Sequence, residues 1–157
     1  MKHRIEEREK IRFIGKRFFI SLANGLNYTE IPAIWDGFPK ESIAELAAMT
    51  DSEPSGVVGL FADKHDGGFD FWIASATTKP CLGHYEVIEI PAATWAIFEA
   101  KGPCPASIQD AFRRVYSDWF PNSEYLRVQI PEIEWFAQGD PTSEDYICEA
   151  WVPVVRK

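Results

Sequence analysis

One glutamate has the setting most suggestive of chemistry. Glu149 lies at the centre of an otherwise apolar and aromatic run, Tyr-Ile-Cys-Glu-Ala-Trp-Val, over residues 146–152. An ionised carboxylate in such surroundings is costly unless it is paired, so it favours a cationic partner. Strand alternation would place Ile147 and Trp151 on the same face as Glu149. The alternative is a glutamate on the solvent face of an ordinary antiparallel strand, which the spacing alone favours.

Aromatic side chains are a second source of binding chemistry. They make up 14% of the chain, which is more ring surface than a core of this size usually needs. Rings arranged around a cation contribute about 0.5–2 kcal/mol each. The candidate ligand-binding rings are Trp35, Phe38, Trp72, Phe98, Tyr116, Trp119, Trp135 and Trp151. Helical aromatic residues often serve only as core, so for Tyr116 and Trp119 core packing is an equal alternative.

A second acidic candidate is Glu134, which is flanked by Ile133 and Trp135. A strand glutamate with its carboxylate in water is the simpler interpretation of this position. Glu149, together with Tyr116 or Glu134, could in principle deliver a proton and position a water molecule.

No metal, cofactor or catalytic triad is expected. Cys81 and His84 have a spacing seen in zinc sites, but tetrahedral zinc needs four ligands and no other Cys or His is paired at short spacing. Cys104 precedes a helix N-terminus, which can lower a thiol pKa. The sequence places no catalytic histidine near Cys104, so we expect this thiol to be inert.

Length and charge restrict the class of protein. The chain has 157 residues, enough for one domain with a sizeable core, and a net charge of −8. Without a basic stripe to neutralise phosphates, direct binding of nucleic acid is not expected. The N-terminus has no apolar signal segment, and no apolar run is long enough to cross a membrane. Three scattered cysteines then favour reduced thiols and a cytoplasmic location.

The elements of the first half follow from its apolar patterns and turn residues. We predict a strand that is bulged near Gly15, a loop, a helix capped by Thr29 and ended by Pro39, a second helix, and a hairpin. Their expected ranges are 4–20, 22–28, 29–38, 40–48, and 57–62 with 69–76, the last two joined by turn formers at 63–68.

The second half has the same order of elements. We predict a long strand over 85–100 interrupted at Pro91, a helix over 107–119, and two strands over 131–137 and 145–155. The helix has one apolar stripe at helical spacing, with Ser107 as its cap and Pro121 as its stop. Phe112 on this stripe is assigned to the core.

The two halves therefore predict a duplicated fold. Repeat one covers about 4–76 and repeat two about 85–155 of a single α+β domain. A duplicated strand–helix–strand–strand unit should join its strands into one antiparallel sheet with both main helices on one face. The space between two helices over a sheet is a natural place for a small-molecule pocket.

Four segments of the second half resemble a known bacterial family. They are the strand around residues 90–103, the helix end Tyr-Ser-Asp-Trp-Phe-Pro at 116–121, Pro-Glu-Ile-Glu-Trp-Phe at 131–136, and Cys-Glu-Ala-Trp-Val-Pro-Val at 148–154. In this order they look like the GyrI-like effector-binding domain, which occurs alone and attached to AraC-type and MerR-type transcription activators. The first half matches more loosely, at residues 31–35 and 71–74.

The resemblance implies a pocket for lipophilic, often cationic, aromatic compounds, with Glu149 at the position of the family's acidic anchor. It raises the ligand role of Glu149 above the solvent-face alternative. The chain has no room for a helix-turn-helix, so we expect a stand-alone binding module. Two alternatives stay open: a small hydrolase of cyclopropane-type xenobiotics, as in some relatives, and a regulator whose partner is another protein. The sequence offers no feature specific to a protein partner or a homodimer.

Overall fold

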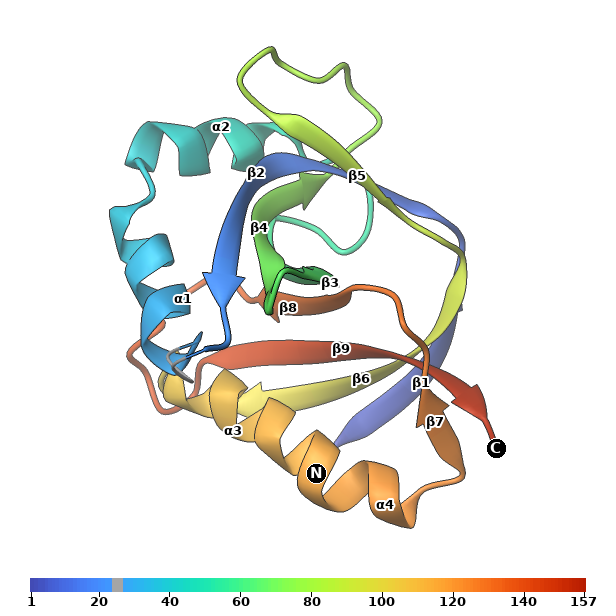
Figure 1. The fold of residues 1–157 in the computed structure, drawn as a ribbon. Coiled ribbons are helices and arrows are strands. Elements are labelled where there is room, and N and C mark those ends of the chain that lie inside the picture. Colours follow the sequence, from blue (N-terminus) through green and yellow to red (C-terminus); the bar gives the residue numbers. More distant parts are fainter. Residues whose placement is uncertain (24–26) are drawn as a thin grey trace. The chain divides into compact units, whose positions relative to one another are not determined.

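The structure, a computed structural model, describes residues 1–23 and 27–157 (Figure 1). The strands are β1 (His3–Arg8), β2 (Ile11–Ser21), β3 (Val57–His65), β4 (Gly68–Ala76), β5 (Glu86–Ile90), β6 (Ala93–Lys101), β7 (Tyr125–Arg127), β8 (Glu132–Phe136) and β9 (Ile147–Arg156). The helical segments are α1 (Asn27–Gly37), α2 (Lys40–Met49), α3 (Ala106–Arg114), the π-helical turn η1 (Val115–Trp119) and α4 (Phe120–Asn122). The predicted α+β class is confirmed, with antiparallel strand pairs throughout the ladders described below.

Contacts between residues divide the chain into two compact units. Unit 1 consists of Met1–Glu9 and Ala92–Lys157, and unit 2 consists of Lys10–Pro91. The single-domain organisation with repeats at 4–76 and 85–155 stays a prediction. In the described part of the chain, no helix combines the length and apolarity needed to span a membrane.

Unit 2 is an antiparallel sheet with its helices packed on one face. Its strand order is β3-β4-β2-β5. Alternate residues of β4, such as Phe71 and Ile73, share a buried apolar cluster with Leu46 and Met49 of α2. Strand alternation explains this packing, because every second side chain of β4 faces the helices.

Unit 1 repeats this arrangement with different elements. Its strand order is β1-β6-β9-β8, and β7 pairs with the far end of β9. The predicted apolar stripe of α3 is confirmed: Ile108, Ala111 and Val115 are buried against Phe98 and Ala150 of the sheet. Phe112 is partly buried and packs against the same cluster, as expected.

Both long strands predicted from the sequence are broken. Residues 4–20 form β1 and β2, which pair with β6 and β5 respectively, and residues 85–100 form β5 and β6. The second break is the interruption predicted at Pro91 and is confirmed, because proline has no N–H to donate to the ladder. The predicted bulge at Gly15 is wrong, since β2 pairs with β4 without a register shift from Phe13 to Ser21. The sequence shows no comparable cause for the break at residues 9–10.

The helix boundaries differ from the prediction at several caps. Helix α1 already begins at Asn27 and ends at Gly37, so Thr29 lies inside it and is not its N-cap. Of the loop expected at 22–28, residues 24–26 lie outside the described residues. Pro105, not Ser107, stands at the N-cap of α3. Pro121 does not stop the helix, because it lies in the first turn of α4, where its missing N–H is tolerated.

The β3–β4 hairpin is tighter than the predicted connection. The strands reach His65 and Gly68, and the turn is Asp66-Gly67, with φ of 48° and 77°. Positive φ at both turn residues is typical of a type I′ turn, whose twist matches that of the flanking strands.

The His65 imidazole predicts a pH dependence at this hairpin. It contacts the Asp66 carboxylate at 2.9 Å and the Asp70 carboxylate at 2.7 Å, and these hydrogen bonds, that of Asp66 foremost, raise the pKa of His65 above 6.5. Because the folded pKa is the higher one, this contribution to stability is complete below pH 6.5 and is lost as pH rises through the folded pKa.

An NMR titration of His65 should therefore give a pKa above 6.5, and Asp66→Asn should lower it. Arg17 also faces Asp70, at 3.8 Å, so Asp70→Asn removes two contacts and is the less specific variant. An unchanged His65 titration in Asp66→Asn would contradict the prediction.

Candidate functional site

The two candidate carboxylates of unit 1 lie on opposite faces of its sheet. In the β8–β9 ladder Trp135 is opposite Glu149, whereas Glu134 is opposite Ala150. Directly opposed residues of antiparallel strands point to the same face. Ala150 belongs to the cluster under α3, so Glu134 faces the helix side and Glu149 the other side.

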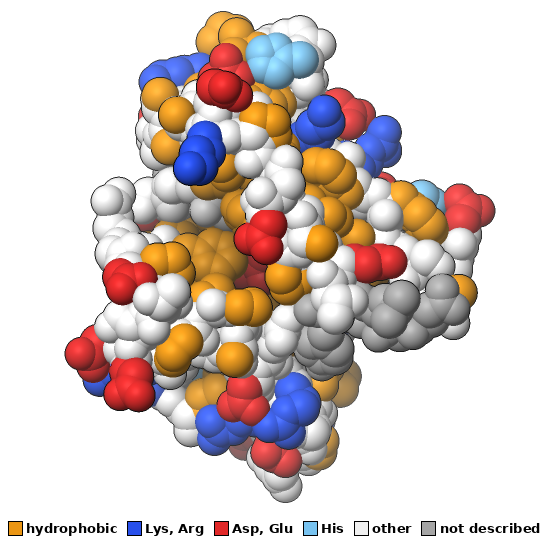
Figure 2. Space-filling view, turned by 90° about the vertical axis from the view of Figure 1, so that its left-hand side faces the viewer, with side chains coloured by type: hydrophobic (Ala, Val, Ile, Leu, Met, Phe, Trp, Pro, Cys, Tyr) orange, Lys and Arg blue, Asp and Glu red, His pale blue; other side chains and the backbone are white. Residues whose placement is uncertain are grey.

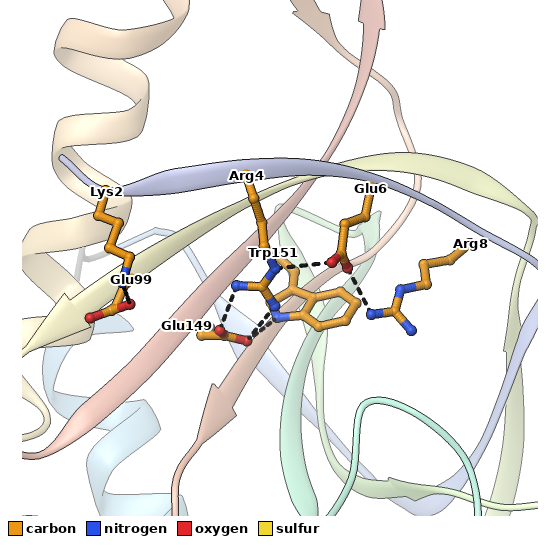
Figure 3. Close-up of polar contacts among 7 residues, drawn as sticks. All are labelled: Lys2, Arg4, Glu6, Arg8, Glu99, Glu149 and Trp151. Atoms are coloured by element: carbon orange, nitrogen blue, oxygen red, sulfur yellow. Dashed lines mark hydrogen bonds and ion pairs between the residues drawn. The ribbon is translucent and has the colours of Figure 1, made fainter.

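Glu149 is paired within the chain. Arg4 of β1 donates from Nη1 to Glu149 Oε2 at 2.9 Å, and the indole Nε1 of Trp151 donates to Glu149 Oε1 at 3.1 Å (Figure 3). The hydrogen bond to Glu149 raises the pKa of Arg4. The side chain of Glu149 is only 13% exposed, so its carboxylate does not point into bulk water. Its role as a ligand anchor stays a prediction.

Further ion pairs surround the Arg4–Glu149 pair. Arg4, Glu6 and Arg8 occupy alternate positions of β1. Figure 3 shows Arg4 beside Glu149 of β9 and Lys2 beside Glu99 of β6. Glu6 accepts from Arg4 at 3.1 Å and from Arg8 at 2.7 Å, and Lys2 pairs with Glu99 at 3.2 Å. The Arg8 guanidinium also lies 5.4 Å from the centre of the Trp151 ring. Among the residues drawn in Figure 3, three cationic side chains therefore balance three anionic ones.

The carboxylates on the helix side of the sheet, Glu132 and Glu134, are buried. Glu134 is 4% exposed, and its charge acts on the thiols of Cys104 and Cys148. Glu132, two residues earlier on the same face, is also buried. Alternation in the sequence Pro-Glu-Ile-Glu-Trp-Phe is the signal that could have placed both acids on one face.

Glu132 has polar partners on neighbouring elements. Arg127 of β7 donates from Nε to Glu132 Oε2 at 3.0 Å, and the hydroxyl of Tyr116 donates to the same oxygen. Tyr116 comes from η1 and is 43% exposed. Burial lowers the pKa of Arg127. The sequence predicted Tyr116 as a site residue but missed Glu132 and Arg127. Arg127 lies in β7, which has only three residues and leaves no strand pattern in the sequence.

The predicted rings of unit 1 fall into two groups. Trp119 packs on Phe98 with ring centres 4.9 Å apart and stacks on Tyr125 at 5.7 Å, all on the helix side. Phe98 is fully buried, so it serves as core in this structure. Trp151 belongs to the opposite face, where its ring packs edge-on against Trp95 with centres 5.9 Å apart. Trp135, which is opposite Glu149 in the β8–β9 ladder, lies on the same face as Trp151.

The remaining predicted rings belong to unit 2. Trp35 packs edge-on against Phe71 at 6.2 Å, and Phe38 against Phe18 at 6.1 Å, both in the cluster under α1 and α2. Trp72 is 5% exposed, and strand alternation directs it to the face of β4 away from these helices. Its buried indole Nε1 has no hydrogen-bond partner among the described residues.

The structure gives Cys81 and His84 other partners than a metal. The Cys81 thiol donates to the carbonyls of Leu82 and Tyr85, and His84 Nε2 contacts Glu45 at 2.7 Å. Within residues 1–23 and 27–157, no three His, Cys, Asp or Glu side chains are grouped so as to hold a metal ion.

Fold and site together define an α+β domain whose chemistry lies in carboxylates and aromatic rings. Residues 1–155 match the family described as the GyrI-like small molecule binding domain, and the chain belongs to this family. It is thus a small-molecule-binding domain related to the effector domains of transcription regulators, as its sequence predicted.

Its relatives include bacterial regulators and a ligand complex. The "Putative transcriptional regulator protein YobU" of Bacillus subtilis is 25% identical over 126 residues, which cover 74% of this chain and 76% of YobU. The structure of SAV2435 bound to tetraphenylphosphonium is similar with a TM-score of 0.87 and 25% identity, covering 99% of this chain and 94% of SAV2435. The "Putative bacterial transcription regulation protein" of Staphylococcus aureus MU50 shares the fold, with a TM-score of 0.81, 23% identity and 98% coverage of both chains.

Proposed function

We propose that this domain binds a lipophilic aromatic cation and that Glu134 is the carboxylate that selects for positive charge. The observation that carries the proposal is the burial of Glu134 on the helix side of unit 1. Phe112, Trp119 and Phe136 are packed against the cluster on that side. A carboxylate removed from water is costly as an anion, and a cation between aromatic rings would compensate it.

Two further carboxylates of unit 1 form ion pairs with arginine. Glu149 and Glu132 each accept a hydrogen bond from an arginine, at 2.9 Å from Arg4 and 3.0 Å from Arg127. The complex of SAV2435 with tetraphenylphosphonium supports the class of ligand, because that relative is similar over almost the whole chain.

Calorimetric titration with tetraphenylphosphonium tests the proposal. We expect Glu134→Gln to weaken binding at least tenfold, which corresponds to about 1.4 kcal/mol. Glu149→Gln is the matched variant, since it removes the same charge from the other face of the same sheet. If Glu134 selects the cation, the affinity of Glu149→Gln should stay within about twofold of the wild type, whereas a loss would favour the anchor role that the sequence predicts for Glu149. Circular dichroism of both variants establishes that they are folded.

Tetraphenylborate, an anion of the same shape, separates charge selection from hydrophobic binding. The wild type should bind it far more weakly than tetraphenylphosphonium. Equal binding of the two ions, or a loss of affinity in Glu149→Gln alone, would contradict the role of Glu134. The hydrolase alternative is tested by incubating the wild-type protein with cyclopropane-containing compounds and analysing the mixture by mass spectrometry. Product in excess of protein would reveal turnover.

We further propose that the domain acts in the cytoplasm and does not contact nucleic acid itself. Its relation to a bacterial transcriptional regulator supports the first part. The net charge of −8 supports the second part, because phosphate backbones repel an acidic surface. Figure 2 shows Lys and Arg side chains interspersed with Asp and Glu on the face that it draws. An electrophoretic shift assay at low salt tests the second part, and retarded DNA would contradict it.

A further inference from the structure

Two cysteines of unit 1 come together at the start of α3. Cys104 lies in the turn between β6 and α3, and Cys148 is the second residue of β9. Gly102, with φ of 130°, turns the chain back after β6, and its N–H donates to the carbonyl of Tyr146 at 2.8 Å. The N–H of Cys104 donates to the carbonyl of Pro141, also at 2.8 Å. These backbone contacts hold the turn against the beginning of β9.

The two thiols lie at the same apolar cluster and differ in exposure. Cys148 is fully buried in the cluster under α3, whereas Cys104 is half-buried and packs against the same cluster. The hydrogen bond from Cys148 lowers the pKa of Cys104 despite its burial, and the same contact, together with burial, raises the pKa of Cys148. Cys104 is therefore the accessible nucleophile, and Cys148 is the protonated partner behind it.

This pairing changes the interpretation of Cys104. The sequence led us to expect an inert thiol, because it shows no histidine near Cys104. In the structure the neighbouring group is instead a second thiol. Ala100 is opposite Cys148 in the β6–β9 ladder, and the contact of the Gly102 N–H with the Tyr146 carbonyl keeps the turn next to the start of β9. A dithiol in contact needs no histidine, since one sulfur can attack an oxidant and the other can then complete the disulfide.

We propose that Cys104 and Cys148 form a redox-active dithiol that is oxidised to a disulfide by peroxides. The Cys104 thiolate attacks one peroxide oxygen, the O–O bond breaks, and Cys104 becomes a sulfenic acid while the leaving oxygen departs as hydroxide or alkoxide and takes up a proton. The Cys148 sulfur then attacks the sulfenic sulfur, the S–O bond breaks, and water leaves with the Cys148 proton. The two thiols lose two electrons and two protons in total, and the peroxide takes them up.

Cys81 provides an internal control for this proposal. It is exposed, belongs to unit 2 and donates to backbone carbonyl oxygens within the described part of the chain. Exposure alone would make Cys81 the first thiol to be modified. The proposal instead requires that the two less exposed thiols be lost together and that Cys81 remain.

The test is treatment of the folded protein with one equivalent of hydrogen peroxide, followed by alkylation and intact-mass analysis. In the wild type and in Cys81→Ser we expect the loss of two thiols and two hydrogen atoms, and peptide mapping should find Cys104 joined to Cys148. In Cys148→Ala the reaction should stop at a sulfenic acid on Cys104 that dimedone traps. Cys104→Ser should keep its remaining thiols.

A melting curve makes the test independent of whether the Cys148 variant folds. A disulfide compatible with the native structure restrains the unfolded chain, so oxidised wild type should melt about 5–10 °C higher than reduced protein, reversibly with dithiothreitol. Three alkylatable thiols after oxidation, a link that includes Cys81, or a lower melting temperature would each overturn the proposal. None of these readouts depends on cation binding, so the proposal can fail without affecting the proposed function.

Discussion

Gly15→Ala is expected to lower the free energy of unfolding by about 3 kcal/mol or more, the upper part of the range for overpacked cores. Gly15 lies in β2 between β4 and β5, opposite Ala74 on one side and Glu86 on the other. A Cβ at this position would lie 2.1 Å from the carbonyl oxygen of Ile73 and 2.5 Å from the Cβ of Ala74. Both neighbours belong to a fully buried strand, so neither can move away without breaking the ladder.

Urea denaturation followed by tryptophan fluorescence measures this loss, with Gly37→Ala as the matched control. Gly37 ends α1, and a Cβ there meets nothing within 4 Å. Alanine favours helix over glycine by about 1 kcal/mol, so the control should be neutral or slightly stabilising. If Gly15→Ala were as stable as the wild type, the close approach of β2 to β4 would be wrong.

The same glycine shows what the sequence can reveal about this fold. A glycine inside an apolar strand signals either a bulge or a close approach of another backbone, and only the pairing of β2 with β4 decides between them. The close approach at Gly15 depends on residues far apart in the sequence, so it was not predictable. Features set by residues close in the sequence were predictable. The apolar stripe through Ile108, Ala111 and Val115 and the turn formers at 66–67 depend only on local spacing.

The candidate site was less predictable because its contacts are long-range. Glu149 was predicted to need a cation, and the cation in the structure is Arg4, which the β1–β6–β9 register brings beside it. No pattern near residue 149 contains that information. The contact between Cys104 and Cys148 depends on register in the same way. In contrast, Glu132 and Glu134 are two residues apart in one strand, so the sequence contains the information that they share a face.

Arg127→Met is expected to cost about 3 kcal/mol of stability, because it leaves the buried carboxylate of Glu132 without its guanidinium partner. The side chains of Arg127 and Glu132 are only 20% and 11% exposed, so water compensates the loss poorly. Arg113→Met is the control: it also breaks an arginine–carboxylate pair, with Asp110, but those side chains are 60% and 47% exposed. An exposed pair contributes about 0–1 kcal/mol, so the control should be nearly silent in the same denaturation experiment.

The double variant Arg127→Met with Glu132→Gln distinguishes a stranded charge from lost packing. If the cost of Arg127→Met comes from an unpaired anion, then neutralising Glu132 should restore part of the stability, about 1–2 kcal/mol, through a favourable coupling in the double-mutant cycle. Tyr116 can still donate its hydroxyl proton to the amide oxygen of the introduced glutamine, because its contact is with a side-chain oxygen at position 132. Additive losses would instead show that the apolar stem of Arg127 matters more than its charge. In that case β7 would hold its place against η1 by packing, and Glu132 would be tolerated in the fold without depending on the guanidinium.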